Sequence, residues 1–279
     1  MYYLPKKGDI LSRNIEDYPD GIVLCIDKPY RWTSADVIRK VKYNAIRHFG
    51  KKNLKVGHAG TLDPLATGIL LVCIGNATKL AETFQKGAKQ YVAGVSFGAT
   101  TPSYDLEKDI DRTFPTDRVS EESVRNILPR FVGEQMQIAP LFSAKSVDGV
   151  RAYETARRLF KQGKLEQGEG IIQANRIEIT SLELLSYTEQ RIDNSAESGR
   201  TGRINVSDIS SAVLKTATIK VDCSKGTYIR ALARDLGEAL GCGAFLSSLR
   251  RTRCGEFSIE DALPLDVEME CLDERSPIL

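Results

Sequence analysis

The segment "KVGHAGTLDPLATGILLVCIG", residues 55–75, contains the features from which the fold and the chemistry can be inferred. Gly60 permits backbone conformations that other residues rarely adopt. Asp63 precedes Pro64, which favours an extended conformation and argues against a helix interior. The continuous apolar run 69–74 is rich in branched residues, as in a strand covered on both faces. We therefore expect Asp63 in a shaped loop just before a buried strand.

The flanking sequence predicts alternating strands and helices. Residues 21–29 predict a buried strand, and Thr33 with Asp36 forms a capping-box pattern that opens a helix. Further helices are expected at 77–86, 119–131, 150–162 and 226–241, and strands at 91–99, 171–187 and 212–223. The strands and helices lack a strict βαβ rhythm, so we expect an α+β fold, a mixed sheet with helices packed on it.

Two segments differ from this pattern. Residues 1–20 are polar and rich in turn-forming residues, which predicts a loosely attached N-terminal arm. Residues 191–211 have little apolar content and no periodicity, which predicts a flexible insertion.

The charge is unevenly distributed along the 279 residues, although the net charge is only +2. Residues 28–58 contain nine Lys or Arg and one acid, whereas residues 256–279 contain eight acids and one Arg. This asymmetry indicates either a face built for a polyanion or a solvated basic helix beside an acidic tail. Composition alone does not separate the two.

Cysteine, histidine and hydropathy patterns exclude several classes of protein. The six cysteines form no CxxC pair, which favours buried thiols in a reducing cytosol over a disulfide framework. Two histidines are too few for a His-rich metal centre. The N-terminus lacks a signal-peptide core, and no apolar run approaches the roughly 18 residues of a membrane span. We expect a soluble, cytoplasmic protein.

The chemistry available to Asp63 is limited by what surrounds it in the sequence. Most exposed loop carboxylates only solvate or cap a turn. The segment has neither phosphate-loop glycine pattern, no further acid to hold magnesium as an aspartyl-phosphate enzyme needs, and no obvious second glycosidase carboxylate. What remains is a single carboxylate acting as nucleophile or base, which needs a cation to keep it ionised and oriented.

Four blocks in order resemble the bacterial TruB family of tRNA pseudouridine synthases. They are "GIVLCIDKPYRWTSADVI" (21–38), "GHAGTLDPLATGILLVCIGNATKL" (57–80), "PLFSAKSVDGVRAYETAR" (140–157) and "CSKGTYIRALARDLGEALGCGAFLSSLRRTRCGEF" (223–257). The resemblance implies a pseudouridine-synthase fold, with a mixed, mostly antiparallel sheet and a central RNA-binding cleft. It makes 21–279 a single catalytic domain that isomerises uridine 55 in the T loop of tRNA without cofactor or metal.

The resemblance also assigns roles to individual residues. Asp63 matches the catalytic aspartate, Arg230 the arginine that pairs with it, and Tyr91 the tyrosine that stacks on the uracil. An arginine would supply the cation that the isolated carboxylate requires.

The resemblance implies substrate contacts as well. His58 matches a histidine that enters the RNA loop, and Tyr228 and Leu249 match residues that line the base pocket. Lys28 and the rest of the basic stretch 28–58 are expected to bind the RNA. The phosphates of the T arm are also expected to meet Lys225, Arg250, Arg251 and Arg253.

Three departures from the family pattern qualify these roles. Arg31 replaces the usual glycine of the K-P-x-G turn, and residues 98–109 replace the pattern around Asp105, which weakens its assignment as an RNA contact. The chain ends soon after the last block, so we expect no C-terminal PUA-type domain and reduced reach toward the acceptor end of tRNA.

Two alternatives remain at this stage. One is the guide-RNA-dependent branch of the same superfamily, which shares the G-H-x-G-T-L-D-P motif. The other is a non-catalytic tRNA-binding or tRNA-folding protein, which would not need Asp63 with Arg230. The main expectation is a monomeric enzyme that needs no protein partner.

Overall fold

The computed structural model describes residues 1–147, 149–168, 170–266 and 272. The chain forms two compact units: Met1–Tyr91 with Arg250–Leu279, and Val92–Leu249. Two strands, β4 (Lys89–Phe97) and β14 (Ala244–Cys254), each begin in one unit and end in the other. The mixed arrangement of strands and helices confirms the predicted α+β class.

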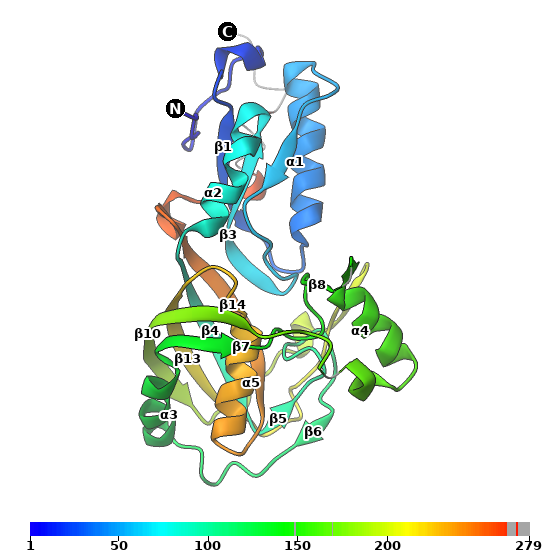
Figure 1. The fold of residues 1–279 in the computed structure, drawn as a ribbon, viewed down its shortest axis with the longest axis vertical. Coiled ribbons are helices and arrows are strands. Elements are labelled where there is room, and N and C mark those ends of the chain that lie inside the picture. The colour runs from blue at the N-terminus through cyan, green and yellow to red at the C-terminus, as the bar shows by residue number, and fades with distance from the viewer. Residues whose placement is uncertain (148, 169, 267–271, 273–279) are drawn as a thin grey trace. The chain divides into compact units, whose positions relative to one another are not determined.

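The first unit is built on β1 (Ile22–Lys28) and β3 (Ala66–Ile74), which pair antiparallel over seven residues (Figure 1). Its strands follow the order β16–β1–β3–β14, with β2 beside β3 and β15 beside β14. The other elements of the unit are η1 (Ile15–Asp17), α1 (Ser34–Phe49), β2 (Val56–His58), η2 (Gly75–Leu80), α2 (Ala81–Lys86), β15 (Phe257–Ser258), η6 (Ile259–Asp261) and β16 (Leu263–Pro264).

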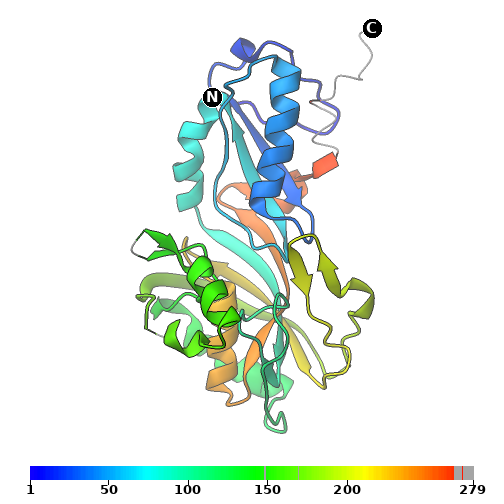
Figure 2. The same cartoon turned by 90° about the vertical axis from the view of Figure 1, so that its right-hand side faces the viewer.

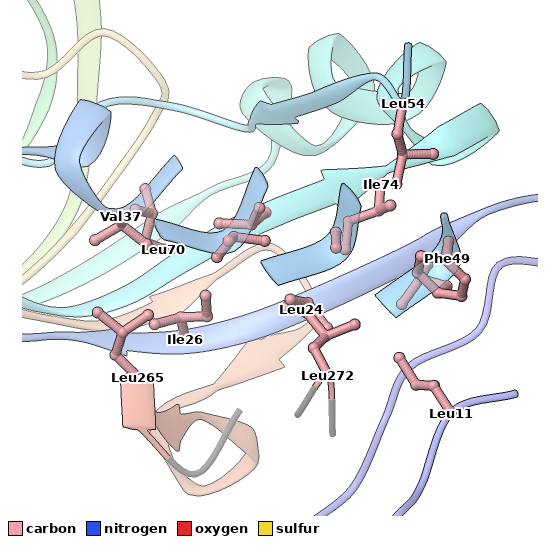
Figure 3. Close-up of a cluster of buried hydrophobic side chains, with 14 residues drawn as sticks. Leu11, Leu24, Ile26, Val37, Phe49, Leu54, Leu70, Ile74, Leu265 and Leu272 are labelled. Atoms are coloured by element: carbon pink, nitrogen blue, oxygen red, sulfur yellow. The ribbon is translucent and has the colours of Figure 1, made fainter. Parts of the chain in front are cut away.

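Both faces of β1 and β3 are covered, as their apolar sequence predicts. Alternate residues of the two strands, with Leu24 and Leu70 among them, pack on Val37 and other buried residues of α1 (Figure 3). The intervening residues, such as Val23 and Leu71, pack in a second cluster with residues of η2 and α2. The capping box of Thr33 and Asp36 is present at the start of α1. This two-sided burial holds the strand that follows the Asp63 loop.

Residues 1–20, expected to form a loose arm, are instead packed onto this unit. Tyr3 pairs with Ile22 beside β1, and Leu11 belongs to the buried cluster under α1. The ring of Tyr2 contacts Phe84 edge-on at 5.4 Å between ring centres. The polar composition of the segment hid these few apolar anchors, which are too widely spaced to show a period.

The second unit follows the strand order β14–β4–β13–β10–β7 (Figure 1). Strands β13 and β10 pair antiparallel, as do β10 and β7. The elements are β5 (Ala99–Thr100), β6 (Arg112–Thr113), α3 (Glu121–Ile127), η3 (Leu128–Phe131), β7 (Gly133–Gln137), β8 (Ser146–Val147), β9 (Val150–Arg151), α4 (Ala152–Lys161), η4 (Leu165–Gly168), β10 (Asn175–Thr188), η5 (Ser195–Glu197), β11 (Gly199–Thr201), β12 (Ile204–Val206), β13 (Lys215–Cys223) and α5 (Ile229–Ala239).

The expected insertion 191–211 contains short ordered elements. Strands β11 and β12 form a hairpin, in the yellow-green part of the chain in Figure 2. Asn194 is buried at its base, where its side chain donates to the Ser207 carbonyl at 2.8 Å and accepts from the Ile209 amide at 2.9 Å. The flexibility of the segment stays a prediction, but Asn194 is buried in it together with Ile204, Val206 and Ile209.

The expected strands and helices elsewhere are confirmed within a few residues of their predicted ends. Among the described residues, no helix is both long enough and apolar enough to span a bilayer. Cys271 and most of the acidic stretch after residue 266 lie outside the described residues.

Candidate active site

The half-buried Asp63 lies in the loop between β2 and β3 of the first unit, and the loop is tied to the start of α1. The Ser34 hydroxyl donates to the Leu62 carbonyl at 3.1 Å and accepts from the Leu62 amide at 2.9 Å. The Ala66 amide donates to the Asp63 carbonyl at 3.1 Å. These hydrogen bonds hold the backbone on both sides of the carboxylate, as a positioned reactive group requires.

Lys28 is a second anchor of the loop. Its residue is fully buried, and its ammonium donates to the carbonyls of Pro29 at 2.9 Å, Trp32 at 2.6 Å and Pro64 at 3.3 Å. Burial lowers the pKa of Lys28 from 10.5 to about 7, and the Asp63 carboxylate partly opposes this shift. The expected direct contact of Lys28 with RNA does not match this burial. The lysine holds the loop and, while it is protonated, supplies a positive charge near Asp63 from within the same unit.

Arg251, expected among the phosphate contacts, is also buried, with 2% of its surface exposed. Its guanidinium donates to the carbonyls of Ile69 at 2.8 Å, Gly60 at 3.3 Å and Thr61 at 3.5 Å. Gly68 makes this packing possible, since a Cβ there would lie 2.2 Å from the Arg251 carbonyl oxygen. The sequence of Arg250, Arg251 and Arg253 predicts a basic surface, and no feature of it indicates that Arg251 is the buried one.

The other predicted site residues of the first unit lie on strands β2, β4 and β14. His58 ends β2 and is half-buried; burial, and then the charge of Arg251, lower the pKa of its imidazole. Tyr91 in β4 is 9% exposed. Arg250 pairs with Asp27 at 2.7 Å, so its charge is already partly neutralised by a carboxylate of β1.

Arg230 lies in the first turn of α5 in the second unit and is 4% exposed, unlike an ordinary arginine on a helix surface. Its guanidinium donates to the Ser103 carbonyl at 3.0 Å and to the Phe142 carbonyl at 2.9 Å. The Asp105 carboxylate lies 3.6 Å away. A buried arginine with these acceptors is held in one orientation, which suits a group that must present a fixed charge.

Asp105 is itself buried and held by its own loop. Its carboxylate accepts from the Ser103 hydroxyl at 2.6 Å and from the Glu107 amide at 2.9 Å. The structure therefore gives Asp105 a role in orienting Arg230. The sequence of residues 98–109 gave no indication of this role, because the role depends on the position of Asp105 beside Arg230 in the folded chain.

Tyr228 precedes α5 and is fixed by Gln137 of β7. The Tyr228 amide donates to the Gln137 side-chain oxygen at 2.8 Å, and the Gln137 side-chain nitrogen donates to the Tyr228 carbonyl at 3.2 Å. The ring packs against a small apolar cluster that includes Ala139 and Ile172. Leu249 in β14 is half-buried. Gln137 was not predicted, since nothing in a short polar strand distinguishes it.

The structure thus brings together Asp63, Lys28 and Arg251 in the first unit, and Arg230 with Asp105 in the second. The pairing of Asp63 with Arg230 stays a prediction. Chemically, the first unit presents a carboxylate on a clamped loop. The second presents a guanidinium, two residues after Tyr228 in the sequence, that is held by the carbonyls of Ser103 and Phe142.

Comparisons with known proteins agree with the four sequence blocks. Residues 47–229 match a family model described as TruB family pseudouridylate synthase (N terminal domain), and residues 230–274 match the tRNA pseudouridylate synthase B C-terminal domain. The chain is 45% identical over 260 residues to a tRNA pseudouridine synthase B of Phocaeicola vulgatus, covering 93% of this chain and 96% of that protein. A tRNA pseudouridine synthase B of Bacteroides thetaiotaomicron has the same identity and coverage.

Solved structures extend the likeness to the fold. A chain in the crystal structure of a Cbf5–Nop10–Gar1 complex is 26% identical with a TM-score of 0.57, over 91% of this chain and 56% of that chain. A chain in an H/ACA ribonucleoprotein bound to a substrate RNA containing 2′-deoxyuridine is 25% identical, with a TM-score of 0.54 over 89% and 53% of the two chains. The family model spans well over half of the residues, and the relatives match almost end to end. The chain therefore belongs to the TruB family of pseudouridylate synthases, which are isomerases.

Proposed function

We propose that this protein isomerises uridine 55 in the T loop of tRNA to pseudouridine, with Asp63 as the nucleophile. The proposal is carried by the end-to-end similarity to proteins named tRNA pseudouridine synthase B, at 45% identity. The clamped loop around Asp63 supports it, because a nucleophile must be held in one geometry.

The reaction conserves every atom of the substrate. Asp63 attacks the target nucleoside, the bond between N1 of uracil and C1′ of ribose breaks, and the base turns. A bond then forms between C5 and C1′, the bond between the Asp63 carboxylate and the substrate breaks, C5 loses its proton, and N1 gains one. The proposal holds whether the carboxylate attacks the base or the sugar, because both routes need an ionised, oriented Asp63.

Several side chains serve this step in the proposal. Arg230 is the proposed cation for Asp63, and its own partners support an orienting role. Tyr91 is proposed to stack on the uracil, and Tyr228 with Leu249 to line the base pocket. None of these assignments needs a redox group.

Recognition of the RNA requires the uridine to leave its stack, at a cost of a few kcal/mol. We propose that His58 occupies the vacated place. Its lowered pKa favours a neutral ring at pH 7, which can stack without desolvating a charge. We also propose that the protein binds the RNA in a central cleft and that it acts as a monomer.

Position-resolved pseudouridine mapping tests the function. Purified wild-type protein is incubated with an unmodified tRNA transcript and no other macromolecule. We expect one pseudouridine, at position 55, and a fall of at least about a thousandfold in its rate for Asp63→Asn. Pseudouridine formed by Asp63→Asn at the wild-type rate would remove Asp63 from its role.

A second candidate is guide-RNA-dependent pseudouridylation, favoured by the likeness to the chain in the H/ACA ribonucleoprotein. The same reaction separates the two. Product formed on tRNA without a guide RNA supports the main proposal. A wild-type protein that modifies RNA only after a guide RNA and partner proteins are added would favour the second candidate.

A further inference from the structure

A pocket of about 540 Å³ lies in the first unit, away from the hydrogen bonds that clamp the Asp63 loop. Three lysines line it: Lys42 of α1, and Lys52 and Lys55 of the segment between α1 and β2. The other lining residues are Asn53, Leu54, Val56, Gly57 and Thr78, so no lining residue is acidic. Helix α1 and strand β2 lie side by side here (Figure 1).

The charge environment of the three lysines differs from that of Lys51 and Lys86. In the part of the chain that the structure describes, none of them forms an ion pair. The adjacent Lys51 pairs with Glu16 at 2.8 Å, and Lys86 pairs with Glu82 at 3.1 Å. Among the described residues, no carboxylate pairs with the three lysines of the pocket, whereas Lys51 and Lys86 are each paired with a glutamate.

The position of the pocket links it to the proposed substrate. Gly57 lines the pocket, and His58 is the next residue of β2. Lys55 precedes His58 by three residues, a separation of about 10 Å along an extended chain. A polyanion that meets His58 can therefore extend over these lysines, and phosphates of a nucleic acid backbone are the anions that such spaced, unpaired ammonium groups bind.

We propose that Lys42, Lys52 and Lys55 form an anion-binding subsite for backbone phosphates of the substrate RNA. This inference rests on the proposed function for the identity of the RNA, but binding can be measured without catalysis. The subsite contributes affinity and the salt dependence of binding, and it takes no part in the chemical step.

The test uses a charge-matched pair of triple variants of the full chain. The pocket variant is Lys42→Gln, Lys52→Gln and Lys55→Gln. The control is Lys86→Gln, Arg125→Gln and Lys220→Gln, three basic residues outside the stretch 28–58 that form ion pairs with Glu82, Glu121 and Glu183. Both variants lose the same net charge, so any difference in binding reports where the charge lies.

The dissociation constant for an unmodified tRNA transcript is measured by fluorescence anisotropy between 50 and 300 mM KCl. For the pocket variant we expect at least about tenfold weaker binding at 100 mM KCl and a salt slope smaller by about two to three. The control stays within about twofold of the wild type. Identical dissociation constants and slopes for the two variants would overturn the proposal. The three pocket lysines are exposed, so their substitution should leave the fold intact. Thermal melting checks that both variants fold.

Two further measurements separate the possible failures. Pseudouridine formation at saturating RNA should keep its maximal rate in the pocket variant while KM rises; a lower maximal rate with unchanged KM contradicts the proposal. A wild type that binds tRNA through the lysines but forms no pseudouridine would overturn the proposed function alone.

Inorganic phosphate at 10 mM and constant ionic strength should leave RNA binding unchanged. Competition by phosphate that the pocket variant abolishes would assign the pocket to a free anion.

Discussion

Lys28 shows how a single buried charge can couple the stability of a catalytic loop to pH. Below pH 7 this lysine is protonated in both the folded and the unfolded chain. Between pH 7 and 10.5 the unfolded chain retains a proton that the folded chain has lost, so stability rises with pH over this window.

The free energy of unfolding of the wild type, measured by urea denaturation, should therefore rise relative to that of Lys28→Met from pH 7 to 9.5. The exposed Lys52→Met serves as the control and should parallel the wild type. Parallel curves for the wild type and Lys28→Met would contradict the lowered pKa.

Arg31 occupies a backbone conformation that favours glycine, with φ at 62°. Its amide donates to the Pro64 carbonyl at 3.0 Å, so this conformation helps to hold the residue after Asp63. The sequence marks Arg31 as a departure from the family pattern, and the structure places it in a turn with its backbone in the left-handed region.

We expect Arg31→Gly to be more stable than Arg31→Ala by about 1 kcal/mol, because both lack the guanidinium and only alanine keeps the left-handed strain. Chemical denaturation of the two variants measures the difference. Equal stabilities would show that this turn relaxes when the side chain is lost.

At the scale of elements, β3 and β14 approach too closely at Gly68 for any side chain. Gly68→Ala would place a Cβ 2.2 Å from the Arg251 carbonyl oxygen, with the backbone at φ 100°. We expect a loss of more than about 2 kcal/mol in the free energy of unfolding. Gly57→Ala in β2 meets no atom within 4 Å and should change stability little.

Helix α5 and the loop 101–106 are joined through the charge of Arg230. Asp105→Ala would remove the buried carboxylate that lies 3.6 Å from this guanidinium, and we expect a loss of about 3 kcal/mol in the free energy of unfolding. Asp109→Ala removes an exposed acid of the same segment and serves as the control. Equal stability of the two variants would show that Arg230 does not need the Asp105 carboxylate to stay buried.

For the whole molecule, chemistry and RNA binding are assigned to different sets of residues. Asp63→Asn should bind unmodified tRNA within about threefold of the wild-type dissociation constant, because the carboxylate adds no favourable interaction with phosphate. Filter binding measures this, beside the mapping of pseudouridine. Loss of binding in this variant, with the fold intact, would make Asp63 a recognition residue.

Much of the fold follows from local patterns. The run 69–74 predicted a strand covered on both faces, and Thr33 with Asp36 predicted the start of α1; both are confirmed. Packing of residues 1–20 and the ordered elements within 191–211 could not be predicted, because each depends on isolated anchors such as Leu11 and Asn194.

The residues of the candidate site show the same division between what local sequence predicts and what depends on tertiary contacts. Apolar period, glycine placement and the four family blocks were enough to single out Asp63, because the constraints on it are local to a loop and the strand that follows. Lys28 and Arg251 owe their roles to burial and to the distant carbonyls of Pro64 and Ile69, and Asp105 owes its role to burial beside the Arg230 guanidinium. Whether a cation faces phosphate or clamps a loop depends on which groups surround it in three dimensions, and one-dimensional charge patterns carry no record of those neighbours.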